Sequence, residues 1–102
     1  MSSQGNGQAE LFKVDMSGQT KVALQQLHKQ AWSAGNSKRF LAALAHIIQR
    51  LQQDPTHFGE PLFHLPALKL EVCQAVVPPL VVNFAIYPEQ SLVFIRGFML
   101  LS

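Results

Sequence analysis

Charge is scarce in this sequence. Charged residues make up 14% of the 102 positions, whereas about 25% is usual for a soluble domain. Hydrophobic residues reach 48%, yet no apolar run approaches the roughly 18 residues that a membrane-spanning helix needs. The shortage of charge therefore indicates apolar surface that a partner protein or a second copy of the chain, as in a homodimer, covers.

Cysteine is nearly absent as well. Cys73 stands alone, which excludes an internal disulfide and is typical of cytosolic proteins. The first ten residues, MSSQGNGQAE, lack the basic and apolar regions of a secretion signal. We therefore expect a cytoplasmic protein that does not associate with membranes. The four histidines show no compact ligand spacing with each other or with the cysteine, so we expect no metal site and no cofactor.

The charges that are present divide unevenly. Residues 1–51 hold six basic and two acidic side chains, whereas residues 52–102 hold two basic and four acidic ones. The basic half predicts either contact with nucleic acid, with or without catalysis, or an ordinary solvated helix face. The candidate RNA-binding residues are Lys38, Arg39, Arg50 and Tyr87. For Tyr87, which stands before a proline, packing is the alternative to a hydrogen bond with phosphate.

Hydrophobic periodicity predicts four strands and two helices in one domain over residues 9–102, after a disordered lead-in over residues 1–8. Alternation predicts strands over residues 10–16, 68–77, 80–87 and 92–101, and a spacing of three to four predicts helices through residues 20–34 and 40–51. Gly35 suits the cap that ends the first helix, while Asn36 and Ser37 can each cap the second. The expected fold class is α+β in the order β-α-α-β-β-β. It has an antiparallel or mixed four-stranded sheet with the helical hairpin packed on one face.

The segment DPTHFGEPLFHL, residues 54–65, joins the second helix to the later strands. Its Asp-Pro start predicts the end of the helix, because a proline pushes the preceding residue out of the helical region. We expect a chain reversal here, with Leu62, Phe63 and Leu65 tucked under the sheet. The histidines of the segment, His57 and His64, are expected to be exposed loop residues.

The element order over residues 10–101 matches a known pattern, as do three local stretches. These are a helix that ends in IIQRLQQDP, the segment FGEPLFHL, and the paired strands of PPLVVNFAIYPEQSLVFIRGF. On these features the sequence resembles the RelE/ParE superfamily of bacterial toxins from type II toxin–antitoxin modules, which includes plasmid-stabilisation proteins. The resemblance implies a toxin-like protein that an antitoxin wraps and holds inactive. RelE-type members cut messenger RNA, mostly on the ribosome, whereas ParE-type members poison DNA gyrase.

The resemblance also implies where catalysis would lie. RNA cleavage through the 2′-hydroxyl needs one group to remove a proton, another to protonate the leaving oxygen, and cations beside the phosphate. RelE-type members carry several such cations on the sheet, whereas the strand half of this chain has only Lys69 and Arg96. With Glu71 as general base, these two residues form the candidate catalytic set.

We expect Lys69 and Glu71 to share one strand face, and Arg96 to join them from a neighbouring strand. A surface salt bridge is the alternative role for the three residues. So small a set leaves two functions open. One is a ribosome-dependent mRNA endoribonuclease with a reduced catalytic set. The other is a catalytically degenerate member of the fold that serves as a protein-interaction or self-association module.

Overall fold

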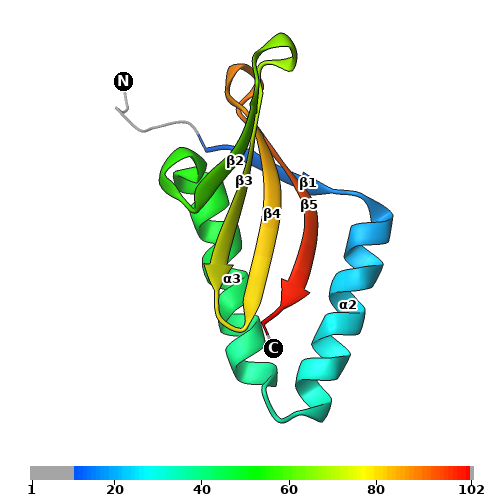
Figure 1. Cartoon of the computed structure of the whole chain (residues 1–102). Coiled ribbons are helices and arrows are strands. Elements are labelled where there is room, and N and C mark those ends of the chain that lie inside the picture. Colours follow the sequence, from blue (N-terminus) through cyan, green and yellow to red (C-terminus); the bar gives the residue numbers. More distant parts are fainter. Residues whose placement is uncertain (1–10, 102) are drawn as a thin grey trace.

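Two helices and five strands follow one another in the computed structural model, which describes residues 11–101 (Figure 1). The expected lead-in over residues 1–8 lies outside this range. The elements are β1 (Lys13–Met16), α2 (Gly18–Ser33), α3 (Ser37–Gln53), β2 (Glu60–Leu65), β3 (Leu70–Val77), β4 (Leu80–Tyr87) and β5 (Leu92–Leu100). Three short 3-10 turns, Pro55–His57, Pro66–Leu68 and Pro88–Gln90, each begin at a proline. The order confirms the α+β class that periodicity predicts.

The helical hairpin forms where the two hydrophobic stripes predict it. The Ser17 hydroxyl accepts from the Thr20 backbone N–H at 3.1 Å and caps α2. Gly35, with φ of +77°, adopts the left-handed conformation that ends α2. The expected side-chain cap of α3 is wrong, because the Asn36 side chain makes no capping bond and the Ser37 hydroxyl instead pairs with His28 Nε2 at 3.0 Å.

The five strands form one mixed sheet in the order β1-β5-β4-β3-β2. β1 pairs with β5 in parallel, and the other neighbours are antiparallel. The parallel pair is possible because the helical hairpin carries the chain between β1 and the later strands. The expected number of four strands is wrong, since β2 adds a fifth at the edge (Figure 1).

β2 occupies the stretch that was expected to reverse the chain under the sheet. All six of its residues are exposed, including Leu62, Phe63 and Leu65. The strand is held by backbone pairing to β3. At its start, a Cβ on Gly59 would lie 2.5 Å from the carbonyl oxygen of Gln74, so only glycine fits this approach.

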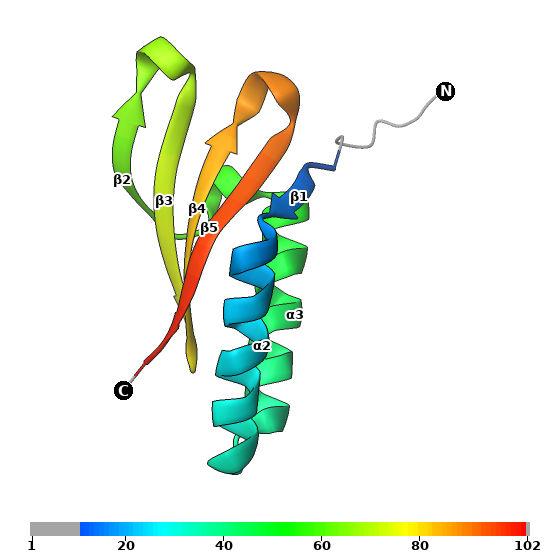
Figure 2. The ribbon, with the colours of Figure 1, turned by 90° about the vertical axis from the view of Figure 1, so that its right-hand side faces the viewer.

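Both helices lie on one face of the sheet (Figure 2). The stripe of α3 is buried against the strands, as predicted from its spacing, through Phe40, Ala43, Ile47 and Leu51. The strands supply the other side of this core from alternate positions, including Cys73, Ala75, Leu80, Val82, Phe84, Ile86, Val93 and Ile95. The opposite face of the sheet carries no helix (Figure 2), and we call it the open face.

Candidate functional site

The open face is built from the alternate positions that the core does not use. Its residues are Lys13 and Asp15 on β1, Phe63 and Leu65 on β2, Leu70, Val72, Gln74 and Val76 on β3, Val81, Asn83, Ala85 and Tyr87 on β4, and Leu92, Phe94, Arg96 and Met99 on β5. Val72 and Ala85 are buried there although no helix covers them. Larger side chains on the neighbouring positions therefore surround Val72 and Ala85, and the face has hollows.

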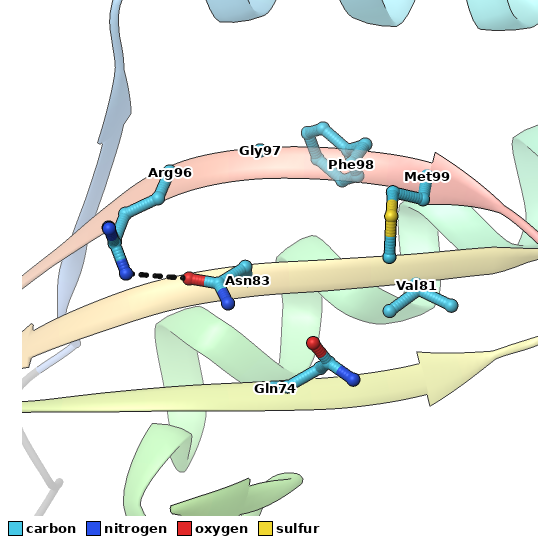
Figure 3. A pocket seen from close by; sticks show the side chains of 7 residues that line it. All are labelled: Gln74, Val81, Asn83, Arg96, Gly97, Phe98 and Met99. Atoms are coloured by element: carbon cyan, nitrogen blue, oxygen red, sulfur yellow. Dashed lines mark hydrogen bonds between the residues drawn. The ribbon is translucent and has the colours of Figure 1, made fainter. Parts of the chain in front are cut away.

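A β-bulge places Arg96 in the middle of this face. Asn83 pairs with Gly97 and Phe84 pairs with Ile95, so Arg96 is an extra residue in β5. Its Nη1 donates to Asn83 Oδ1 at 3.2 Å across the strand pair (Figure 3). The bond holds the guanidinium along the sheet surface while the side chain stays exposed. Arg96, a candidate catalytic residue, thus lies on an accessible face.

Two hollows flank Arg96, and it lines both. The larger, of about 540 Å³, is otherwise lined by Phe63, Leu65, Leu70, Val72, Ala85, Tyr87 and Phe94. The smaller, of about 250 Å³, is lined by Gln74, Val81, Asn83, Gly97, Phe98 and Met99 (Figure 3). Tyr87, a candidate RNA-binding residue, therefore shares a hollow with Arg96. Both hollows are mainly apolar, with one cation between them.

Lys69 and Glu71 do not join Arg96, and the expected arrangement of the three residues is wrong. Lys69 precedes β3 in a left-handed conformation with φ of +53°, and its Nζ lies 3.2 Å from Glu89 Oε2. Glu71 pairs with Ile86 of the core and so points to the helix-bearing side. These residues line a separate hollow of about 220 Å³ with Thr56, His64 and Glu89. Their catalytic roles remain predictions, and the structure separates them from Arg96.

Cys73 lies under the same side of the sheet as Glu71. Its Sγ donates to Glu71 Oε1 at 3.7 Å, and His64 Nδ1 lies 4.0 Å from Glu71 Oε2. Burial, with a smaller contribution from the Glu71 charge, raises the pKa of the Cys73 thiol to about 11. The thiol is therefore a poor nucleophile near neutral pH. No group of three or more metal-ligating side chains occurs among the described residues.

The three basic RNA-binding candidates are divided between two places in the helices. Lys38 and Arg39 are exposed in the first turn of α3, close in sequence to the exposed Trp32. Arg50 lies in the last turn, 5.0 Å from the centre of the Phe58 ring, and Nη2 donates to the His57 carbonyl oxygen at 3.3 Å. Arg50 therefore supports the connection between α3 and β2, whereas Lys38 and Arg39 are free to contact a ligand.

Several residues of the open face were not among the sequence candidates. Asn83 orients Arg96, and Phe63, Leu65 and Phe94 wall the larger hollow. The polar residue in LVVNFAIY was a usable indication, since Asn83 interrupts an otherwise apolar strand as Arg96 does. Phe63 and Leu65 had no comparable indication, because the sequence does not predict β2 as a strand, and Phe94 is one of many apolar residues in β5.

The comparisons with known proteins rest on structure. No protein-family model matches the sequence, and no curated protein matches it. No helix among residues 11–101 is long and apolar enough to cross a membrane. The structure is similar to a chain of the crystal structure of the archaeal RelE–RelB complex from Pyrococcus horikoshii OT3, with a TM-score of 0.61 and 18% sequence identity. The match covers 87% of this chain and 93% of that chain, so this chain has the RelE-like fold that its element order predicts.

Proposed function

We propose that this chain is the toxin-like component of a type II toxin–antitoxin pair and that it acts on messenger RNA at the ribosome through its open face. The similarity to the RelE–RelB complex supports an antitoxin-like partner. The observation that carries the proposal is the position of Arg96, which a bulge holds on an accessible, hollowed face. A guanidinium so placed can bind a phosphate oxygen and stabilise the charge that develops on it.

The chemistry that surrounds Arg96 is sparse. Tyr87 lines the same hollow and is a candidate to exchange a proton with RNA. Lys69 and Glu71 face another hollow, so they do not complete a catalytic set around one phosphate. The expected activity is therefore slow cleavage in which the ribosome positions the RNA and Arg96 supplies charge.

Contact with the ribosome is assigned to the helical layer. Residues 17–53 contain five basic residues and no acidic one, so α2 and α3 present a uniformly positive surface. Lys38 and Arg39 are its exposed members at the start of α3. We expect ribosome co-sedimentation to weaken in the Lys38→Gln/Arg39→Gln double variant and to fall steeply as salt rises, because RNA binding releases counterions.

The test of the activity is a reconstituted translation reaction in which cuts in the message are mapped by primer extension. Ribosome-dependent cuts that disappear in Arg96→Ala but persist in Lys69→Ala support the proposal, since the two cations lie in different hollows. Lys69→Ala is the matched control because it also removes one exposed cation. Intact message and normal protein yield at excess protein would reject the activity.

A second candidate function follows from the separation of Lys69 and Glu71, which line another hollow, from Arg96. A RelE-like fold in which these two residues do not act beside the open-face cation is suited to binding without cleavage. In that case the open face serves only protein association. Intact message together with a stable complex that depends on Arg96 would select this function.

A further inference from the structure

The open face combines two features that suit a protein ligand of defined chemistry. Its hollows are lined mainly by apolar side chains, and its rim carries Phe63 and Met99, which are 58% and 57% exposed. Exposed side chains this large, grouped on one face, mark a binding surface more often than a free one. The cation between the hollows then determines what kind of segment can bind.

Arg96 has hydrogen-bonding capacity left over. A guanidinium has five N–H donors, and among the described residues the Arg96 side chain makes one hydrogen bond, to Asn83, and no ion pair. Asp15, on the neighbouring strand β1, uses its Oδ1 to accept from the Met16 backbone N–H at 2.8 Å. A ligand that covers both hollows also covers Arg96, and it must supply an acceptor or leave a charge without a partner.

We propose that the open face binds one amphipathic helix of a partner protein, with a single Asp or Glu in the middle of its apolar stripe. The carboxylate accepts from the Nε and Nη2 edge of the Arg96 guanidinium, which the bond to Asn83 leaves free, and apolar side chains on either side fill the two hollows. This inference rests on the proposed function, since the helix would be the segment of the antitoxin-like partner that covers the open face around Arg96. A helix suits the place because an uncovered sheet face is normally closed by a helical layer.

The positions of Phe94, Arg96 and Met99 along β5 predict how far the apolar residues of the bound helix lie from its acid. Along β5, Phe94 lies two residues from Arg96 and Met99 lies three residues from it on the other side, which corresponds to roughly 7 Å and 10 Å. In a helix, four residues span about 6 Å and seven span about 10 Å. The bound helix should therefore carry apolar residues four positions from its acid on one side and seven positions from it on the other.

Other occupants fit the face less well. RNA that is not held by the ribosome requires several cations along its path, and among residues 11–101 Arg96 is the only cation that lines either hollow. Residues 1–10 contain only Met1 and Ala9 as apolar side chains, too few to fill two hollows. A second copy docked about a two-fold axis at Arg96 would place two guanidinium groups side by side.

The test is selection from a displayed library of helical peptides of about twenty residues, a length at which isolated helices form, against the whole protein. We expect enriched peptides to share one acid flanked by apolar residues at the stated spacings. Their affinity should fall roughly ten- to a hundredfold for Arg96→Gln, because a charge-assisted hydrogen bond is lost. Lys69→Gln, which removes an exposed cation elsewhere, should leave the affinity unchanged.

A charge exchange gives the sharper result. Arg96→Glu should reject the acidic peptides and bind versions in which the acid is replaced by lysine. Enriched peptides without an acid, an affinity that does not depend on residue 96, an absence of enriched helices, displacement of the peptides by free RNA in the absence of ribosomes, or a dimer that blocks them would each overturn the proposal. Acidic peptides that bind while translation is unaffected would leave this inference standing and remove the toxin activity. Cleavage of message without acidic helix binding would do the reverse.

Discussion

The two sides of strand β4 make the central comparison of this molecule. Leu80, Val82, Phe84 and Ile86 point to the helices and are almost completely buried. Val81 and Ala85, on the open side, are nearly as inaccessible at 6% and 4%. The first side is covered by α2 and α3, whereas the second is shielded only by neighbouring side chains. Burial on one side thus reflects packing of the core, and burial on the other reflects the depth of a hollow.

The largest expected effect separates the two sides by stability. Phe84→Ala should lower the free energy of unfolding by about 4 kcal/mol, because a fully buried ring leaves a cavity. Phe63→Ala on the open face also removes a phenyl ring, but this side chain is 58% exposed. The variant should lower the free energy of unfolding by less than about 1 kcal/mol. Urea unfolding followed by circular dichroism measures both values. Equal losses would show that the open face is as much a part of the folding core as the helix side.

The next effect tests whether β2 can be displaced while the core between the sheet and the helices stays folded. In Gly59→Ala the new Cβ meets the Gln74 carbonyl at 2.5 Å at a φ of +84°, so we expect a loss of about 3 kcal/mol from strain and displacement of β2. Gly35→Ala is the control, since its φ of +77° is similar but its surroundings are open, and it should cost about 1 kcal/mol. Amide hydrogen exchange should show loosened β2 and an intact core.

The fate of β2 explains what sequence patterns could and could not predict about the fold. The sequence predicts helices and central strands because their buried positions recur with a fixed period, as in α3 and β4. Every residue of β2 is exposed, so no such period exists and its proline suggests a turn. Its pairing to β3 is made by backbone groups, which side-chain patterns do not report. The sequence therefore predicts a sheet of four strands, whereas the structure has five.

The predicted arrangement of the candidate catalytic residues was also wrong, for a reason that side-chain patterns do not report. Alternation places Lys69 and Glu71 on one face of β3 but does not say which face meets the helices, because apolar residues occur on both. The face of Glu71 also carries Cys73 and Ala75, which are buried against the helices, whereas Arg96 lies on the opposite face of the sheet with Phe94. Lys69 precedes β3 in a left-handed conformation and is not part of the strand. Arg96 could therefore be recognised by its chemistry, as a charge within an apolar strand, but its neighbours depend on how the sheet is oriented against the helices.

A smaller effect concerns the basic residues of the helical layer. Arg50→Ala should cost about 1 kcal/mol, since it removes the contact with the Phe58 ring and the bond to the His57 carbonyl. Lys38→Ala, at an exposed position, should stay within about 0.5 kcal/mol of the native protein. Thermal melting measures both, and ribosome binding should show the opposite order of sensitivity. A stability loss for Lys38→Ala equal to that for Arg50→Ala would contradict the division between supporting and contacting residues.

The smallest effect lies at the connection between the helical layer and β2. His57 Nδ1 donates to Asp54 Oδ1 at 2.8 Å, and this bond holds the pKa of the Asp54 carboxyl below its usual 3.8. Because the folded pKa is lowered, the stabilisation is complete above pH 3.8 and fades as pH falls through the lower folded value. Asp54→Asn should therefore shift the urea midpoint slightly downward at neutral pH and progressively less in acid. A shift that stays constant down to the lowest pH at which the protein remains folded would mean that Asp54 acts through its shape in the turn rather than through its charge.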